Sequence, residues 1–194
     1  MGTSPILHQF RKAGALLDGH FLLSGGLHSP TYLQCALALQ SPKDAAFYGA
    51  EIVGDLTREG LADGIETVAS PAIGGLVIGF AVAQVLGVKF IWTERQDGEM
   101  TLRRGFSLEL GEKILVVEDV ITTGGSTREC IAALEANGGK VVGAASIIDR
   151  SNGKADVGVP RIALLNLDVP SYSEDECPLC KEGSDPVKPG SRTK

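Results

Sequence analysis

Short apolar runs alternate with longer amphipathic stretches along most of the chain, and this alternation predicts an α/β fold. Residues 114–117 form an unbroken aliphatic run without a charge, as expected of a strand buried on both faces of a parallel sheet. We therefore expect a central, mostly parallel sheet flanked by helices. The same reasoning places the other strands at 67–69, 88–92, 140–148 and 161–167, and the helices at 41–60, 76–86 and 126–137.

A smaller element precedes this alternation. Ser4 and Pro5 open a predicted amphipathic helix that continues to Leu17, with the proline in its first turn. Residues 19–35 then predict a hairpin with a glycine-rich turn, of a kind that can cover a site at a sheet edge. We expect one domain over residues 1–194, made of this hood at about 1–40, an α/β core at about 41–168 and a tail at 169–194 that is ordered at first and then frays.

Length and charge narrow the classes of function. The chain has 194 residues, of which 43% are hydrophobic, which is enough to bury the core of one globular domain. Its formal net charge is −6 and no basic cluster is longer than Arg103-Arg104, so we expect no nucleic-acid partner. No stretch has the pattern of a signal peptide or a membrane span, so we expect no membrane association and a cytoplasmic location.

The cysteines and histidines offer one candidate metal motif. Cys177 and Cys180 form a Cys-x-x-Cys pair, but a zinc site normally needs four ligands. No second pair or histidine lies nearby in the sequence, so a solvent-facing turn is the expectation and a structural metal the alternative. His20 and His28, in the predicted hairpin, are expected to be surface turn residues.

The strongest candidate chemistry follows the strand at 114–117. Glu118 and Asp119 end that strand, and in an open α/β sheet ligands collect at the carboxyl ends of the strands. The turn at 122–126 reads Thr-Thr-Gly-Gly-Ser, whose glycines and hydroxyls suit a phosphate. An acidic pair before such a turn suits a ribose 5-phosphate, because the carboxylates can accept hydrogen bonds from the ribose hydroxyls while the turn binds the phosphate. The alternative without a function is an ordinary strand-turn-helix with an acidic N-cap. Neither Gly-x-Gly-x-x-Gly nor Gly-x-x-x-x-Gly-Lys-Ser/Thr occurs, so a nicotinamide-dependent oxidoreductase is remote.

Three other segments are expected at the same edge of the sheet. Residues 70–75 give a second small-residue turn before a helix, which would suit a second phosphate or merely allow close packing. Residues 93–106 form the longest polar connection, predicted to be a lid carrying three arginines rather than a solvated hairpin. Arg150 follows the strand at 140–148, where its guanidinium could form a bidentate pair with a carboxylate.

These motifs carry a resemblance to a known family. The sequence Val-Val-Glu-Asp-Val-Ile-Thr-Thr-Gly-Gly-Ser at 116–126 resembles the phosphoribosyl-pyrophosphate (PRPP) signature of type I phosphoribosyltransferases. With Gly-His-Phe-Leu-Leu at 19–23, Pro-Ala-Ile-Gly-Gly at 71–75 and Ile-Asp-Arg at 148–150, the chain resembles orotate phosphoribosyltransferases from about Leu7 to Pro189. The resemblance implies the type I phosphoribosyltransferase fold. It also implies transfer of ribose 5-phosphate from PRPP to N1 of orotate, giving orotidine 5′-monophosphate and pyrophosphate in pyrimidine (UMP) synthesis.

The resemblance also implies roles for individual residues. Mg²⁺ is expected as cofactor, held mainly through PRPP without a direct protein ligand, and the chain is expected to form a homodimer that shares the loop 93–106 across its interface. Glu118, Asp119 and Arg95 are the expected catalytic residues. The ribose 5-phosphate group is assigned to Glu118, Asp119, Val120, Ile121, Thr122, Thr123, Gly124, Gly125 and Ser126; orotate to Thr122, Arg150, Tyr32 and Leu33; and pyrophosphate to Ala72, Ile73, Gly74, Arg95, Arg103 and Arg104.

The chain departs from the family pattern at three places. The family's hairpin lysine falls at Ser24, and Ile73 and Gly74 occupy the region of its pyrophosphate-loop lysine. The loop 93–106 lacks the usual Arg-Lys-x-x-Lys-x-His pattern, and Arg103 and Arg104 would have to compensate. Two alternatives therefore stay open: a phosphoribosyltransferase for another base, such as a purine, and a non-catalytic PRPP-sensing regulator of the same fold.

Overall fold

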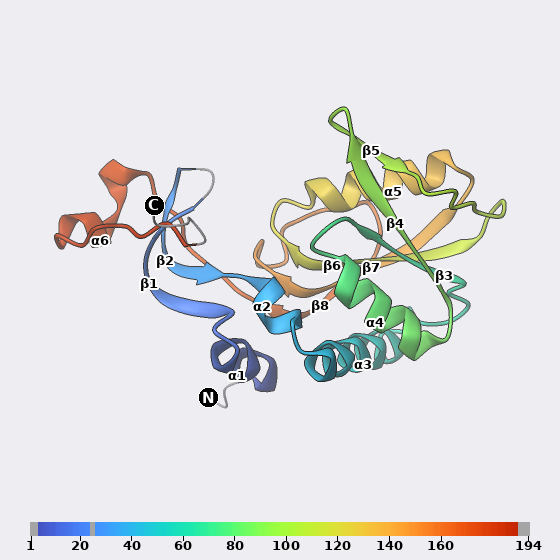
Figure 1. Cartoon of the computed structure of the whole chain (residues 1–194), viewed down its shortest axis with the longest axis horizontal. Helices are drawn as coiled ribbons and strands as arrows, with labels where there is room; N and C mark the ends of the chain where they lie inside the picture. Colours follow the sequence, from blue (N-terminus) through green and yellow to red (C-terminus); the bar gives the residue numbers. More distant parts are fainter. Residues whose placement is uncertain (1–3, 24–25, 190–194) are drawn as a thin grey trace. The chain divides into compact units, whose positions relative to one another are not determined.

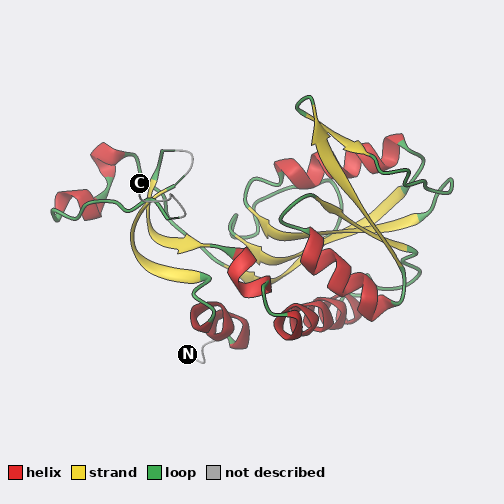
Figure 2. Ribbon diagram, viewed as in Figure 1, coloured by secondary structure: helices red, strands yellow, loops and turns green. Residues whose placement is uncertain are grey.

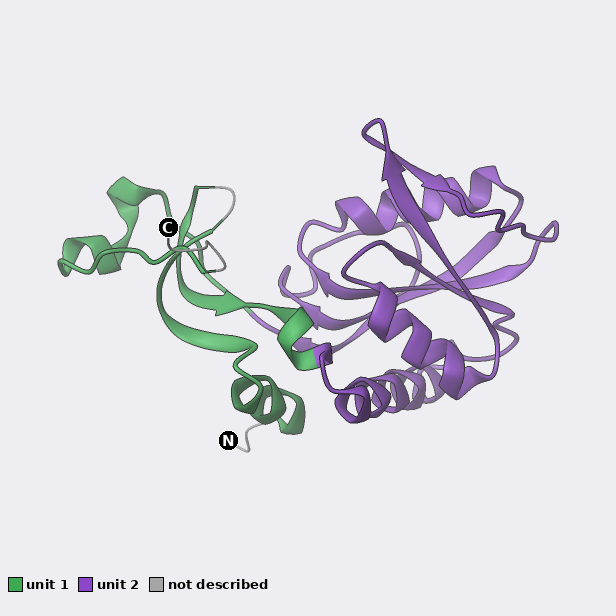
Figure 3. Ribbon diagram, viewed as in Figure 1, with its two compact units in different colours: residues 1–38, 168–194 green, residues 39–167 purple. Residues whose placement is uncertain are grey.

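The computed structural model describes residues 4–23 and 26–189. The chain divides into two compact units, one formed by residues 1–38 and 168–194 and the other by residues 39–167 (Figure 3). The C-terminal segment thus belongs with the N-terminal hairpin rather than with the α/β core. The single-domain organisation expected from the sequence stays a prediction.

The larger unit is built on a six-stranded sheet with the order β5-β4-β3-β6-β7-β8 (Figure 1). All neighbouring strands pair in parallel except β5, which runs antiparallel to β4 at one edge. This confirms the predicted mostly parallel sheet. The strands are β3 (Thr67–Pro71), β4 (Lys89–Gln96), β5 (Glu99–Leu102), β6 (Lys113–Ile121), β7 (Lys140–Asp149) and β8 (Arg161–Asn166).

Helices cover both faces of this sheet. In Figures 1 and 2, α3 (Pro42–Arg58) and α4 (Leu76–Leu86) lie on one face and α5 (Gly125–Ala136) lies on the other. The start of α3 follows the sequence signals: Pro42 occupies the first turn, and the Ser41 side chain accepts a hydrogen bond from the backbone N–H of Asp44 at 3.3 Å. On the α5 side, the apolar face of that helix packs on the central strands in one buried cluster: Ala69, Ile91, Ile114, Val116, Cys130, Ile131, Leu134, Val141, Ala144 and Val157.

The strand order creates a switch point between β3 and β6. From β3 the chain moves through α4 to β4 on one side, whereas from β6 it moves through α5 to β7 on the other. The two connections leave in opposite directions, so the carboxyl ends of β3 and β6 form a topological switch point. In open α/β sheets this is where ligands bind.

The predicted hairpin is present in the smaller unit. It consists of β1 (Leu16–Leu22) and β2 (His28–Leu33), which pair antiparallel; α1 (Pro5–Lys12) precedes it and α2 (Cys35–Leu39) follows it. The first helix is shorter than predicted, because the chain leaves it at Ala13 and Gly14 takes a φ of +68°. The hairpin position Ser24 lies outside the described residues.

The C-terminal segment folds onto this hairpin. It contains the 3₁₀ turn Glu174–Glu176 and the short helix α6 (Pro178–Lys181), and isolated β-bridges join Tyr172 to His28 and Val187 to Phe21. Cys177 is fully buried, so the expectation of a solvent-facing turn at Cys177 and Cys180 is wrong. The expectation of surface histidines is also wrong, because His20 and His28 are buried.

Candidate active site at the carboxyl ends of the strands

The acidic pair lies in the last part of β6. The strand continues to Ile121, longer than the apolar run predicts, so Glu118 and Asp119 are both held by the sheet and only half-buried. Thr127, in the first turn of α5, donates a hydrogen bond from its hydroxyl to Glu118. The backbone N–H of Val120 donates to Asp119 Oδ1 at 2.9 Å. Both carboxylates are therefore fixed in direction by neighbouring donors.

Burial perturbs both carboxyl groups. Loss of solvent raises the pKa of Glu118 to about 7, against the opposing hydrogen bond from Thr127, and the neighbouring Asp119 raises it further. Loss of solvent also raises the pKa of Asp119, and the hydrogen bonds from Val120 and its own backbone only partly offset this. Two neighbouring carboxyl groups with raised pKa values at a strand end are typical of a functional site.

The turn after β6 forms a small cavity. Residues 120–126 and Glu118 line a space of about 70 Å³, which suits a single small anionic group rather than a whole nucleotide. Gly124 begins α5 with a φ of +76°, and a Cβ there would lie 2.8 Å from Val157 Cγ1. Only glycine fits both the backbone conformation and the space. Arg128 fixes the turn from behind, because its Nη1 donates to the carbonyls of Thr123 at 2.9 Å and Asp156 at 2.6 Å.

The turn after β3 reaches the acidic pair. A Cβ on Gly74 would lie 2.7 Å from Asp119 Oδ1, so the two strand ends approach closely and no side chain fits between them. Ser70 donates its hydroxyl to the carbonyl of Val117 at 2.7 Å, which ties the end of β3 to β6. The peptide bond between Ala72 and Ile73 is cis, and the Ile73 side chain is exposed. The expected pyrophosphate turn thus approaches the acidic pair at the switch point.

Arg150 joins the same edge of the sheet. Its backbone N–H donates to the carbonyl of Ile121 at 2.8 Å, which puts Arg150 beside Thr122, the residue that follows β6. The preceding residue, Asp149, is fully buried and forms an ion pair with Arg161 at 2.8 Å. Burial opposes ionisation of Asp149, but hydrogen bonds from Ser151, Arg161 and the backbone of Gly153 outweigh it and hold its pKa below the usual value. This network fixes the start of the loop that carries Arg150.

The segment 93–106 is not an irregular loop. Its first part extends β4 and pairs with β5, from Thr93 opposite Leu102 to Gln96 opposite Glu99, so the expected lid is a polar hairpin. A lid function for it stays a prediction. The polar pattern misled the prediction because an edge hairpin exposes polar side chains on strands as readily as a loop does.

The three arginines of this hairpin contact carboxylates of the same chain. Arg104 makes two hydrogen bonds to Glu94, at 2.8 and 3.0 Å, and Arg103 lies 3.6 Å from the same carboxylate. The hydrogen bond from Arg104 lowers the pKa of Glu94. Arg95 pairs with Glu129 on α5 and donates to the carbonyl of Gly98 at 2.8 Å. No described contact joins these guanidinium groups to residues 72–74 or 118–126.

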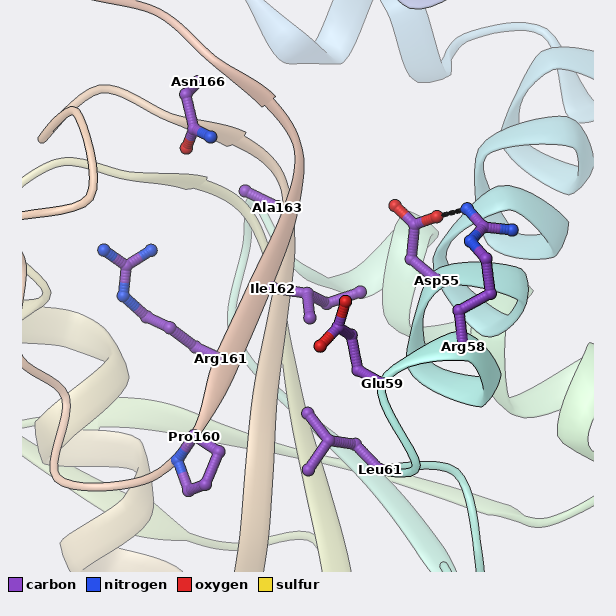
Figure 4. Close-up of a pocket in the computed structure, with 9 residues that line it drawn as sticks. All are labelled: Asp55, Arg58, Glu59, Leu61, Pro160, Arg161, Ile162, Ala163 and Asn166. Carbon is purple, nitrogen blue, oxygen red and sulfur yellow. Dashed lines mark ion pairs between the residues drawn. The ribbon is translucent and has the colours of Figure 1, made fainter.

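The largest described cavity lies elsewhere. It has a volume of about 700 Å³ and lies between the end of α3 and the edge strand β8 (Figure 4). Asp55 and Arg58 pair with each other on its helix side, and Arg161 belongs to its strand side. It shares no lining residue with the turn at 120–126. Its polar lining holds two acidic residues, Asp55 and Glu59, and no serine, threonine or cysteine that could act as a nucleophile.

Two of the expected orotate contacts belong to the smaller unit. Tyr32 and Leu33 end β2, and the Tyr32 hydroxyl donates to Gln34 Oε1 at 3.0 Å. Their expected role stays a prediction. Within the described ranges, no helix is long and apolar enough to cross a membrane.

Comparison with known proteins identifies the family of this chain. The family described as "Phosphoribosyl transferase domain" matches residues 43–160. The orotate phosphoribosyltransferase of Pelotomaculum thermopropionicum is 50% identical over 192 residues, covering 99% of each chain, and that of Desulforamulus reducens is 49% identical over 192 residues, covering 99% of this chain and 98% of the relative. The chain belongs to the orotate phosphoribosyltransferase family.

A solved structure of this family has the same fold. The orotate phosphoribosyltransferase of Aeropyrum pernix superposes with a TM-score of 0.66 at 27% identity, covering 81% of this chain and 91% of the other. A solved adenine phosphoribosyltransferase superposes with a TM-score of 0.65 at 16% identity, which reflects the shared fold alone. The resemblance drawn from the signature at 116–126 is therefore confirmed for family and fold.

The positioning roles of two residues at the site were not predicted from the sequence. Thr127 orients Glu118, and Arg128 holds the turn through two backbone carbonyls. Both immediately follow the signature of the orotate phosphoribosyltransferase family and lie in the first turn of α5. Their position directly after Ser126 was the one feature of the sequence that could have pointed to them. The sequence does not indicate that the Arg128 side chain turns back toward Asp156.

Proposed function

We propose that this chain transfers the ribose 5-phosphate group of PRPP to N1 of orotate, giving orotidine 5′-monophosphate and pyrophosphate in de novo pyrimidine (UMP) synthesis. The observation that carries the proposal is the placement of two small-residue turns, an acidic pair and Arg150 at the carboxyl ends of the adjacent strands β3, β6 and β7. Membership of the orotate phosphoribosyltransferase family supports the choice of base.

PRPP would bind across the switch point. Glu118 and Asp119 would accept hydrogen bonds from the ribose hydroxyls, and the turn at 122–126 would hold the 5-phosphate through its backbone N–H groups and hydroxyls. The pyrophosphate would lie toward residues 72–74, which the contact between Gly74 and Asp119 brings next to the ribose end. The acidic pair, approached by one turn and followed in sequence by the other, suits one ligand with a phosphate at each end.

Orotate would bind beside Thr122. Arg150 would pair its planar guanidinium with the carboxylate that distinguishes orotate from uracil, because a bidentate pair of this kind is specific in geometry as well as strong. Tyr32 and Leu33 would flank the base. In the reaction the bond from C1′ to the pyrophosphate oxygen breaks, N1 of orotate loses its proton and the bond from C1′ to N1 forms.

The acidic pair would also assist the chemistry. The ribosyl group gains oxocarbenium character as pyrophosphate leaves, and fixed carboxylates nearby stabilise positive charge as it develops. Thr127 and the Val120 amide keep those carboxylates in place without reorganisation. Glu118 and Asp119 are therefore proposed as catalytic residues through charge and positioning rather than as nucleophiles.

Mg²⁺ fits the donors at this site. Carboxylate and hydroxyl oxygens are the hard ligands that Mg²⁺ prefers, and it commonly takes most of its coordination from substrate phosphates and water. The contact of Asp119 with the Gly74 turn puts such oxygens next to the proposed pyrophosphate position. Bound with PRPP, Mg²⁺ would neutralise negative charge on the leaving group.

The hairpin at 93–106 is proposed as the mobile part of the site. Arg95, Arg103 and Arg104 are exposed, and exposed ion pairs contribute little to stability, so their present carboxylate partners can be exchanged for pyrophosphate oxygens at little cost. We propose that the exchange occurs in a homodimer, with Arg95 reaching the partner's site. The expected cytoplasmic location stays a prediction.

A panel of free bases tests the proposed function. The purified protein is mixed with PRPP and Mg²⁺, and loss of base and release of pyrophosphate are measured for orotate, uracil, adenine and hypoxanthine. We expect equal amounts of orotate consumed and pyrophosphate released, with little reaction of the other three. Turnover of a purine instead would make the chain a transferase for another base. Saturable PRPP binding without turnover of any base would favour the non-catalytic regulator.

A further inference from the structure

Four metal-ligating side chains converge in the smaller unit. They are His20, His28, Cys177 and Cys180, and one potential ligand atom from each lies within 4.8 Å of all the others. His20 Nε2 lies 3.1 Å from His28 Nδ1, 3.5 Å from Cys177 Sγ and 3.8 Å from Cys180 Sγ. Cys180 Sγ lies 3.2 Å from His28 Nδ1. Both cysteines are free thiols.

The fold holds these residues from three directions. His20 belongs to β1 and His28 to β2. The register between these two strands shifts between Asp18 and Phe21, and an irregularity of this kind changes the direction of nearby side chains such as that of His20. The C-terminal segment is tied down on both sides of its cysteines. Tyr172 exchanges backbone hydrogen bonds with His28 at 2.8 and 2.9 Å, and the Val187 N–H donates to the carbonyl of His20 at 2.8 Å.

We propose that His20, His28, Cys177 and Cys180 bind one zinc ion in a tetrahedral S₂N₂ site. Zinc–nitrogen bonds of about 2.0–2.1 Å and zinc–sulfur bonds of about 2.3 Å place the ligand atoms of a tetrahedron about 3.3 Å apart for two nitrogens and about 3.6 Å apart for nitrogen and sulfur. The observed separations of 3.1 Å between the two nitrogens and 3.2–3.8 Å between nitrogen and sulfur agree with these values.

Burial and charge also suit zinc. Cys177 is fully buried, His20 and His28 are buried, and Cys180 is partly exposed. Two thiolates, two neutral imidazoles and Zn²⁺ sum to zero charge, so the loaded site avoids the cost of a buried net charge. The second nitrogen of His20, Nδ1, lies 3.2 Å from Ser184 Oγ. Metal-bound histidines commonly use their second nitrogen in this way, and the contact would fix the tautomer that leaves Nε2 for the metal.

The donor set favours a single structural ion. Two sulfur and two nitrogen ligands in a tetrahedron are typical of zinc or iron–sulfur centres. A two-iron centre with two histidines and two cysteines keeps the histidines on one iron and the cysteines on the other. Here three nitrogen–sulfur separations are 3.8 Å or less and all four ligand atoms lie within 4.8 Å of one another, so they surround one point. Four protein ligands leave no open position, which is the pattern of a structural rather than a catalytic zinc.

The site would act as a clamp on the smaller unit. This unit is built on a two-stranded sheet, and a hairpin of that size is marginal by itself in water. Zinc would join the hairpin to a segment more than 150 residues further along the chain, as the separation of 157 positions between His20 and Cys177 indicates. The proposal does not depend on the proposed activity.

Metal analysis of the whole chain tests the site. The protein is purified under reducing conditions without chelator, and its zinc content is measured by inductively coupled plasma mass spectrometry in wild type, Cys180→Ser, His28→Ala and His8→Ala. His8 is the matched control, because it is exposed on α1, outside the cluster. We expect about one zinc per chain in wild type and His8→Ala and almost none in the other two. Equal zinc in Cys180→Ser and wild type would overturn the proposal.

A second measurement uses wild type alone, so it holds even if the ligand variants fail to fold. The metal is removed with a chelator and the reduced protein is titrated with Co²⁺. We expect saturation at about one ion per chain, with the strong visible bands of tetrahedral cobalt and a sulfur-to-cobalt charge-transfer band in the near ultraviolet, all displaced by Zn²⁺. Absence of these bands, or a Cys177–Cys180 disulfide in protein that contains no zinc, would overturn the proposal.

Discussion

Replacing Glu118 by Gln should stabilise the unliganded protein at pH 8. The pKa of Glu118 is raised from 4.5 to about 7 because the half-buried carboxyl group loses contact with solvent. Each pKa unit corresponds to about 1.4 kcal/mol, so ionised Glu118 costs the folded state on the order of 3 kcal/mol well above pH 7. An amide carries no charge, and its oxygen can still accept the hydrogen bond that Thr127 donates.

The sign of the pH dependence follows from the raised pKa. Between pH 4.5 and about 7 the folded state binds more protons at Glu118 than the unfolded state does, so stability falls as pH rises through this window. Below pH 4.5 the carboxyl group is protonated in both states and the cost vanishes. The advantage of Glu118→Gln should therefore be large at pH 8 and below about 1 kcal/mol at pH 5.

Urea unfolding measures this difference. The single tryptophan, Trp92 in β4, reports unfolding by fluorescence at both pH values. Glu135→Gln serves as the control, because Glu135 is exposed on α5 and its replacement should change stability by no more than about 0.5 kcal/mol at either pH. Equal stability of Glu118→Gln and wild type at pH 8 would refute the reasoning. The stabilised variant should also bind PRPP more weakly, since sites that retain a costly charge usually do so for function.

Two further substitutions test the site at the switch point. Asp119→Asn should weaken PRPP binding by about 10- to 150-fold in calorimetry, because hydrogen bonds to a charged group contribute about 1.5–3 kcal/mol. The amide oxygen can still accept from Val120, and an unchanged Kd would contradict the assignment. Gly124→Ala should lower the free energy of unfolding by about 1–3 kcal/mol, because it combines a φ of +76° with a Cβ only 2.8 Å from Val157. Gly125→Ala, whose Cβ meets nothing closer than 3.6 Å, is its control, and equal stability of the two variants would contradict this account.

The core of the fold could be predicted from local patterns. Buried parallel strands are continuous apolar runs, so β6 and β7 were visible in the sequence to within a few residues. The pairing of β4 with β5 was not visible in the sequence, because the paired residues are mostly polar. The pairing also depends on the turn at Asp97, which adopts a φ of +53°. An extended polar edge strand and a polar loop have the same composition, so only the tertiary hydrogen bonds distinguish them.

The candidate active site was predictable because its residues are close in sequence. The acidic pair and its phosphate turn occupy nine consecutive positions, 118–126, and Arg150 follows the next strand of the sheet. The cluster of His20, His28, Cys177 and Cys180 was missed for the opposite reason. Its ligands come from both ends of the chain and meet only because β-bridges tie the C-terminal segment to the hairpin. Spacing rules for metal sites assume ligands in one local segment, and they fail when long-range strand pairing supplies half of the set.

The selectivity of Arg150→Ala for orotate over uracil tests the central claim most directly. The ratio of kcat/KM for the two bases is measured with PRPP and Mg²⁺ in wild type, in Arg150→Ala and in the control Arg58→Ala, an exposed residue of α3 that pairs with Asp55. Loss of a charged hydrogen-bond partner should cost about 1.5–3 kcal/mol with orotate and little with uracil, so the ratio should fall by about 10- to 150-fold in Arg150→Ala alone. An unchanged ratio would contradict the claim that the strand-end arginine recognises the carboxylate of the base.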